Sequence, residues 1–211
     1  MAQRGRPARL SRDAVIAAAE AVVRTEGSAA LSMRRVARDL GSSPMALYRH
    51  VQDKDDLLRQ LLDRIARQLQ RPSPPQDPHD RVMVVGRAVH GWLIVHPWAI
   101  DALPAHLMGW STAWIAEDIV AALIAGGMAP YDAAVGYQVI WQYLVGELTL
   151  AHSDAAGETR HPGPDVADYR RRGLSTLASV ADAWREIGRH DTFDRGLAAL
   201  VDGLLNAEDR E

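Results

Sequence analysis

Apolar residues recur at intervals of three and four along almost the whole chain, and alternating runs of β-branched residues are missing. A period near 3.6 places apolar side chains on one face of a helix, whereas a half-buried strand needs a period of two. Proline interrupts the pattern most densely at residues 71–80, where four of ten residues are proline. The chain is therefore expected to be all-α, with nine or ten helices.

The proline-rich segment is expected to separate two parts of the chain, because proline cannot continue a helix. We expect a domain at residues 1–52, a connecting helix and joint at 53–77, and a larger helical domain at 78–211. Residues 1–71 hold 14 Arg or Lys against 8 Asp or Glu, a balance of +6, and the remainder stands at −9. This asymmetry favours contact of the first part with a polyanion. A chance clustering of solvated charges is the alternative.

Several absences limit the class of protein. The chain has no cysteine, no uninterrupted apolar run of about eighteen residues, and no apolar segment after its basic N-terminus. A disulfide scaffold, a thiol-ligated zinc site, a membrane-spanning helix and a secretory signal are therefore not expected. With 47% apolar residues the composition is globular. We expect a cytoplasmic protein that does not contact a membrane.

The first third of the chain contains the start and stop signals of four short helices. Helix-capping residues stand at Ser11, Ser32, Ser43 and Asp53, and helix-ending glycines at Gly27 and Gly41. Pro44 follows its cap at a position where the missing N–H costs nothing. The turn LGSS, residues 40–43, then joins two helices into a helix-turn-helix, whose second helix fits the DNA major groove, about 12 Å wide. Met45, Tyr48 and Arg49 are expected on its outer surface.

The segment ALSMRRVARDLGSSPMALYRHVQDKDDLL, residues 30–58, resembles the DNA-binding domain of the tetracycline-repressor (TetR) family, with the similarity running from about Ser11 to Leu62. Its most specific part is LYRHV followed three residues later by a lysine. The resemblance implies an N-terminal three-helix DNA-binding domain, a larger effector-binding and dimerisation domain, and a homodimer that reads a palindromic operator. It also implies a transcriptional regulator that a ligand releases from DNA.

The resemblance also assigns roles to single residues. Arg34 stands at a base-contacting position, while Tyr48, His50 and Lys54 stand at phosphate-contacting positions. The tip of the recognition helix is apolar and small, so the sequence leaves open which bases are read. The full set of expected DNA contacts is Ser32, Arg34, Ser43, Pro44, Met45, Ala46, Tyr48, Arg49, His50 and Lys54.

Lys54 is the single lysine in a chain with 23 arginines. At the start of a helix the free N–H groups and the macrodipole favour an anion, and an ammonium group adds three rotatable donors. A phosphate contact is therefore one interpretation of Lys54. The other is a solvent-exposed pair with the neighbouring Asp53, Asp55 or Asp56. The family pattern favours phosphate.

The larger part of the chain contains all six tryptophans, with histidines and glutamines between them. A cavity lined by aromatic residues with a few polar groups is the usual form of a small-ligand site. For any one of these polar residues a satisfied core or surface position is the alternative. We expect a small, largely apolar effector to contact Trp92, His96, His106, Trp110, Trp114, Gln138, Trp141 and Gln142.

The segment YQVIWQYLVGEL, residues 137–148, lies in a helix with two apolar stripes, so it must be buried on more than one side. One stripe is assigned to the core and the other to a partner subunit, together with the last helix of the chain. The alternative is a purely intramolecular core. In the family the two corresponding helices of each subunit form a four-helix dimer interface. The expected interface residues are Gly136, Ile140, Tyr143, Leu197, Leu200, Val201 and Leu204.

Signals of catalysis are weak. The segment GWSTA resembles a nucleophile elbow only loosely, because Ala113 replaces the last glycine and no strand precedes it. His90 and His96 are six apart, which does not place two imidazoles on one helical face. The sequence predicts no catalytic residue, no cofactor and no metal site. A metal held by distant histidines together with the effector, as in some relatives of the tetracycline repressor, is the alternative. An activator, an effectorless regulator, or a carrier or enzyme with an incidental helix-turn-helix are the alternatives to a ligand-released repressor.

Overall fold

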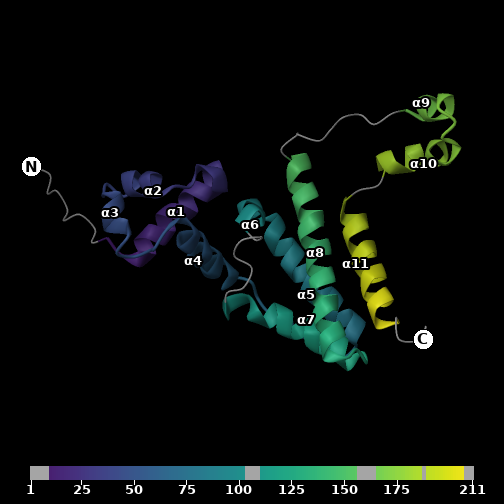
Figure 1. Cartoon of the computed structure of the whole chain (residues 1–211), viewed down its shortest axis with the longest axis horizontal. Coiled ribbons are helices and arrows are strands. Elements are labelled where there is room, and N and C mark those ends of the chain that lie inside the picture. Colours follow the sequence, from purple (N-terminus) through teal and green to yellow (C-terminus); the bar gives the residue numbers. More distant parts are fainter. Residues whose placement is uncertain (1–9, 103–109, 156–164, 187–188, 207–211) are drawn as a thin grey trace, which may run out of the picture. The chain divides into compact units, whose positions relative to one another are not determined.

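A computed structural model describes residues 10–102, 110–155, 165–186 and 189–206. Every regular element in these ranges is helical, which confirms the all-α prediction. Among the described helices, none combines the length and the apolar character that a membrane crossing requires. The helices are α1 (Arg12–Glu26), η1 (Ser28–Ala30), α2 (Met33–Asp39), α3 (Pro44–Leu47), α4 (Lys54–Ala66), α5 (Pro78–Ile94), α6 (Pro97–Ala102), η3 (Trp110–Thr112), α7 (Ala113–Ala125), α8 (Pro130–Ala155), α9 (Val166–Arg171), α10 (Ser175–Glu186) and α11 (Arg189–Leu205) (Figure 1).

The chain divides into two compact units. The first contains residues 1–71 and 92–116, and the second contains residues 72–91 and 117–211. This division groups residues 92–116 with the N-terminal helices and falls inside α5 and α7. The expected functional boundaries at residues 52 and 77 stay predictions.

The N-terminal helices of the first unit begin where the capping signals predict. The side chains of Ser11, Ser32, Ser43 and Asp53 each accept a hydrogen bond from a backbone N–H of the first helical turn. Helix α1 packs against α2 and α4, and α2 packs against α3. Fully buried Val15, Leu47 and Leu61 lie in the core of these helices. Burying one such side chain stabilises the fold by about 1.5–3 kcal/mol.

Helix α3 is shorter than its apolar spacing suggests. Gly41, two residues after the end of α2, adopts φ +60°, a left-handed conformation that favours glycine and turns the chain toward α3. Helix α3 then runs only from Pro44 to Leu47, and residues 48–50 continue in turns, with the N–H of His50 donating to the Leu47 carbonyl at 2.8 Å. Val51 is nevertheless buried, because the turns keep it on the core side.

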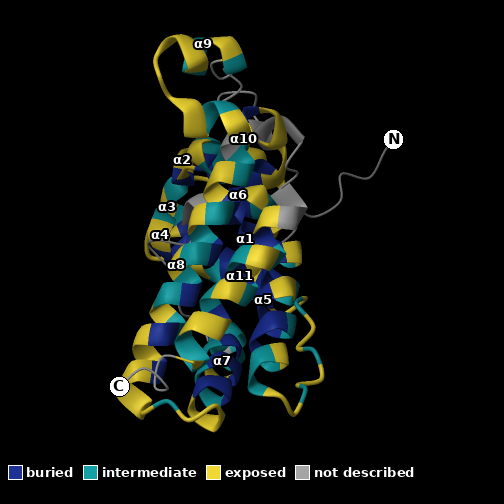
Figure 2. Cartoon of the chain, turned by 90° about the vertical axis from the view of Figure 1, so that its right-hand side faces the viewer, coloured by how far each residue is buried: buried dark blue, intermediate teal, exposed yellow. Residues whose placement is uncertain are grey.

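The second unit is built around α8 and α11, which pack side by side (Figure 1). Leu144 and Leu148 of α8 and Leu197 and Val201 of α11 are buried between helices. Single helices change from buried to exposed around their circumference (Figure 2), as amphipathic helices of a globular protein do.

Polar side chains join α5 to the other helices of the second unit. The fully buried carboxylate of Asp118 in α7 accepts a hydrogen bond from Arg81 at 2.7 Å. The Nε2 atom of buried His90 lies 2.6 Å from Glu147 in α8, and the His90 ring stacks on Phe193 of α11 at a centroid distance of 3.7 Å. A buried charge is tolerated only with such a partner.

Candidate nucleic-acid interface

The helix-turn-helix presents its predicted contact residues at the surface. Ser32 and Arg34 at the start of α2 are exposed, as is Ser43 at the start of α3. The hydroxyls of Ser32 and Ser43 also accept backbone N–H groups at 3.2 and 3.3 Å, so each caps its helix while remaining accessible. Such hydroxyls can still donate to an external acceptor.

The remaining predicted contacts lie on α3 and just after it. Met45 is 75% exposed and Tyr48 is 49% exposed, so both side chains are accessible from outside the chain. Arg49 is exposed, and Ala46 and His50 are half-buried. The structure therefore leaves this whole group accessible.

A hollow of about 680 Å³ lies between α2 and α3. Its lining includes Arg34, Arg38 and Pro44, together with the hydroxyl-bearing residues Ser32 and Ser42. Arginine and serine side chains that surround a concave surface form a site for an anionic group. Arg38 and Ser42 are not among the contacts that the family resemblance implies, and the apolar pattern of this segment gives no signal for them.

Arg35 has a different role from its neighbours on α2. Its guanidinium donates to Glu26 at 2.7 Å and to Asp39 at 2.8 Å. The hydrogen bond from Arg35 lowers the pKa of Glu26, and the bonds to Glu26 and Asp39 raise the pKa of Arg35 further above its usual range. These two carboxylates are thereby engaged by one arginine.

The start of α4 is held by two aspartates. Asp53 accepts the N–H of Asp56 at 2.7 Å, and Asp56 accepts the N–H of Gln52 at 2.8 Å. Asp56 is only 8% exposed. Burial raises the pKa of Asp56, but hydrogen bonds from Gln60 and Gln52 outweigh that effect and leave the pKa below its ordinary value.

This arrangement bears on Lys54, the first residue of α4. Two of its three candidate partners, Asp53 and Asp56, already bind backbone N–H groups. Among the described residues Lys54 itself forms no ion pair. Its half-buried side chain therefore brings a positive charge to a helix N-terminus, where an anion is already favoured.

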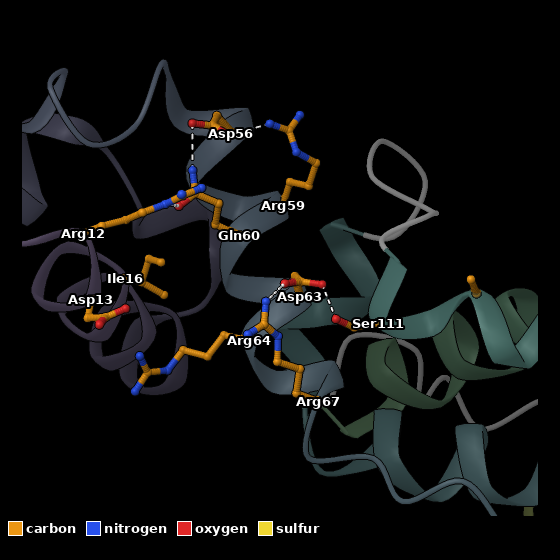
Figure 3. Close-up of a pocket in the computed structure, with 11 residues that line it drawn as sticks. Arg12, Asp13, Ile16, Asp56, Arg59, Gln60, Asp63, Arg64, Arg67 and Ser111 are labelled. Carbon is orange, nitrogen blue, oxygen red and sulfur yellow. Dashed lines mark hydrogen bonds and ion pairs between the residues drawn. The ribbon is translucent and has the colours of Figure 1, made fainter.

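A second hollow, of about 910 Å³, lies in the first unit between α1, α4 and η3 (Figure 3). Its polar groups largely satisfy one another. Arg12 donates to Gln60 at 2.6 Å, and Gln60 donates to Asp56 at 2.9 Å. Asp63 accepts hydrogen bonds from Arg67 and from Ser111. The polar side chains that line this hollow therefore form a hydrogen-bond network that joins α1, α4 and η3.

The predicted effector contacts fall into two groups. Trp92, His96 and Trp114 are half-buried residues of the first unit, whereas Gln138, Trp141 and Gln142 lie on α8 in the second. His106 and the side chain of Trp110 lie outside the described residues. Their assignment to one pocket stays a prediction.

Trp92 and His96 form a close pair. The Nδ1 atom of His96 lies 2.8 Å from the backbone carbonyl of Trp92, so Nδ1 carries the proton and Nε2 of a neutral ring is an acceptor. The Trp92 indole N–H is buried and has no hydrogen-bond partner among the described residues. A buried donor of this kind is costly unless something accepts from it.

Several predicted dimer contacts lie in the core of the single chain. Ile140, Leu197 and Val201 are at most 1% exposed, and Gly136 is also buried. These residues pack within the single chain, and their place in a dimer interface stays a prediction. Apolar spacing cannot tell which of two stripes faces the core. Tyr143, Leu200 and Leu204 are half-buried.

One group of possible metal ligands occurs among the described residues, at the start of α5. It consists of Asp77, His79 and Asp80, and the His79 ring also lies 3.5 Å from Asp202. Asp77 and Asp80 are exposed, so water can satisfy these charges without an ion.

Residues 15–61 match the family model described as bacterial regulatory proteins, tetR family. The chain is 31% identical over 215 residues to the HTH-type transcriptional repressor DrrR1 of Streptomyces coeruleorubidus, which covers 95% of this chain and 79% of the relative. The sequence is thus similar to a regulator over nearly its whole length.

Solved structures share the fold. ActR of Streptomyces coelicolor, in complex with actinorhodin, has a TM-score of 0.75 at 24% identity and covers 97% of this chain and 100% of its own. BioQ of Mycobacterium smegmatis has a TM-score of 0.72 at 24% identity, with 93% and 98% covered. BioQ has also been solved with its double-stranded DNA operator.

Proposed function

The chain belongs to the TetR family of bacterial DNA-binding transcriptional regulators, and we propose that it is a homodimeric repressor that a small molecule releases from a palindromic operator. The family consists of regulators and not of enzymes. Repression is supported by DrrR1, the relative that is named a transcriptional repressor.

The observation that carries the DNA-binding proposal is the accessible polar surface of α2, α3 and the start of α4. Arg34 and Lys54 are free of ion pairs among the described residues, while nearby acids bind Arg35 or backbone N–H groups. Positive charge that is not neutralised within the chain is available to phosphate. We assign Arg34 to a base edge and Tyr48, His50 and Lys54 to the phosphate backbone.

Ser32 and Ser43 supply hydroxyls to the same surface, and Arg49 adds an exposed charge. Pro44, Met45 and Ala46 offer only apolar groups to the groove. Apolar contact distinguishes thymine by its methyl group, so α3 can contribute little else to direct readout. Arg34 is therefore the main candidate for hydrogen-bonded base recognition.

We place the dimer interface on the exposed faces of α8 and α11. Along α8 the exposed residues include Val135, Gln142 and Gly146, which recur at a helical spacing. Along α11 they include Ala199 and Gly203. A side chain added at Gly146 or Gly203 would meet nothing within 4 Å in the single chain, so another helix can approach these positions closely. Two α8–α11 pairs would form a four-helix interface.

The effector is proposed to be small and largely apolar, with a few polar groups. The solved complex of ActR with actinorhodin shows that a protein of this fold can hold a small molecule. In this chain the unpartnered Trp92 N–H and the free Nε2 of His96 would offer one donor and one acceptor to such a molecule. Release requires that the molecule bind the released conformation more tightly.

Selection of bound sequences from random duplexes tests this function. A palindromic site should emerge, with half-sites about 34 Å apart or a multiple of that distance. Arg34→Ala should then relax preference at one base pair of each half-site, at a cost of about 1–3 kcal/mol. If no sequence is enriched and no duplex shows salt-dependent binding, the protein is not a DNA-binding regulator.

A further inference from the structure

Helix α2 carries three arginines in different environments. Arg35 is engaged by Glu26 and Asp39. Arg34 forms no ion pair among the described residues, and the Arg38 side chain is 71% exposed. The Nε atom of Arg38 lies 3.6 Å from Asp39 Oδ1, whereas Arg35 holds the other oxygen of that carboxylate at 2.8 Å. Arg38 therefore has only a weak, shared anionic partner.

Position on the helix brings Arg34 and Arg38 together. Residues four apart lie on the same face of a helix, and both arginines line the hollow of about 680 Å³ between α2 and α3. Ser42, in the turn between these helices, lines it as well. The hollow thus combines a mostly free guanidinium with a hydroxyl beside the first residue of the recognition helix.

We propose that Arg38, assisted by the Ser42 hydroxyl, binds a phosphate of the DNA backbone. The assignment rests on the proposed DNA-binding function. In a helix-turn-helix the first helix crosses the backbone while the second enters the groove, which brings exposed residues of α2 near phosphates. Arginine and serine are common donors to phosphate, and guanidinium can donate to two phosphate oxygens at once.

Arg35 is a positioning residue for this contact. Arg35 holds Glu26 and one oxygen of Asp39, so the Asp39 carboxylate that lies 3.6 Å from Arg38 is shared with a second, closer guanidinium. The three arginines of this short helix therefore differ in the groups that they bind. Arg35 binds the protein's own acids at short distances, whereas the exposed Arg38 has only the longer contact with Asp39 and can bind an external anion.

The contact can be tested by titrating the full chain with its selected operator and with a random duplex at several salt concentrations. Arg38→Ala should weaken binding to both duplexes by about tenfold and lower the salt slope by about 0.9 per subunit. Arg38→Lys should keep the slope. Arg170→Ala, which removes an exposed arginine of α9, is the control and should change neither quantity.

Unchanged binding by Arg38→Ala would overturn the proposal, and so would a loss confined to the operator with an unchanged slope, which indicates base reading. A wild-type chain that binds neither duplex would instead contradict the proposed function. Arg35→Gln tests the positioning role, with thermal unfolding used to verify the fold. It should weaken DNA binding in the wild-type background and much less in the Arg38→Ala background. Equal losses of DNA affinity in both backgrounds would show that Arg35 does not act through Arg38.

Discussion

Ser111, in η3, donates a hydrogen bond to Oδ1 of Asp63, in α4 (Figure 3). The other oxygen of the Asp63 carboxylate accepts from Arg67 at 2.6 Å. Burial raises the pKa of Asp63, but the hydrogen bonds from Ser111 and Arg67 prevail and lower it overall. Helix α4 begins with Lys54 at the proposed DNA surface, so this bond fixes the segment before α7 to the same helix.

Ser111→Ala should lower the free energy of unfolding by about 1.5–3 kcal/mol at neutral pH, because a hydrogen bond to a charged acceptor is lost. A carboxyl with a depressed folded pKa stabilises the fold above the ordinary aspartate value of about 3.9, and that stabilisation is lost as pH falls through the folded pKa. The difference between variant and wild type should therefore shrink in acid. Urea unfolding at several pH values measures it. Ser73→Ala, at an exposed serine, is the control, and a pH-independent loss would contradict the assignment.

Lys54→Ala should weaken binding to operator and random DNA alike and reduce the salt slope by about one unit per subunit. The reason is the loss of a positive charge at a helix N-terminus without an internal ion pair. Lys54→Arg should retain most of the slope. Anisotropy titrations over a salt series measure both effects. If Lys54→Ala matches wild type at every salt concentration, Lys54 does not contact phosphate.

Gly196→Ala should destabilise the fold by about 1–3 kcal/mol through overpacking. A Cβ atom at Gly196 would lie 2.2 Å from the hydroxyl oxygen of Tyr143. That hydroxyl donates to the carbonyls of Thr192 and Phe193 at 3.0 and 3.1 Å, so the ring cannot move without losing them.

Gly91→Ala is the matched control for this substitution. Gly91 also lies within a helix, but its added Cβ would meet nothing within 4 Å. It should therefore be neutral or stabilise by up to about 1 kcal/mol. Thermal unfolding of both variants measures the two changes in stability. Equal changes would show that the contact with Tyr143 does not destabilise Gly196→Ala.

Ala199→Glu should convert the proposed dimer to a monomer and abolish tight operator binding, because the change places charge on the exposed face of α11. The single chain should remain folded, since Ala199 is not part of its core. Analytical ultracentrifugation and circular dichroism measure these two properties. Asp182→Glu, at an exposed position of α10, should leave the dimer intact. A dimeric Ala199→Glu variant would exclude this face.

An inducer should quench or shift the emission of Trp141, which is half-buried on α8 and stacks on Tyr137 at a centroid distance of 6.4 Å. Trp141→Ala should impair induction and leave ligand-free DNA binding nearly intact. Moving the population from 1:99 to 99:1 takes about 5.5 kcal/mol of differential binding. By reciprocity, operator DNA should weaken inducer binding by the same factor. Fluorescence titration with and without operator checks this, and equal inducer affinity in both would rule out the coupling.

Local signals in the sequence predicted the all-helical class, the caps of the N-terminal helices and the family. Ser11, Ser32, Ser43 and Asp53 cap helices as predicted, since a cap depends on residues only a few positions apart. The motif around residues 47–54 likewise identified the DNA-binding domain, which the family match at residues 15–61 confirms. The extent of α3 was not predictable in this way, because Leu47 and Val51 are buried whether the intervening residues form a helix or turns.

Only the tertiary structure shows which partners residues of the same chemical type have. Three arginines of α2 are alike in sequence, yet only Arg35 meets Glu26, a partner nine residues away on α1. Two apolar stripes of α8 are also alike, and only the packed structure shows that Ile140 is buried in the chain itself. The bond between Ser111 and Asp63 joins residues 48 positions apart. The sequence alone thus determined which residues form helices, since neighbours along the chain set that choice. Partners distant along the chain determined which charges and apolar faces remain free to bind.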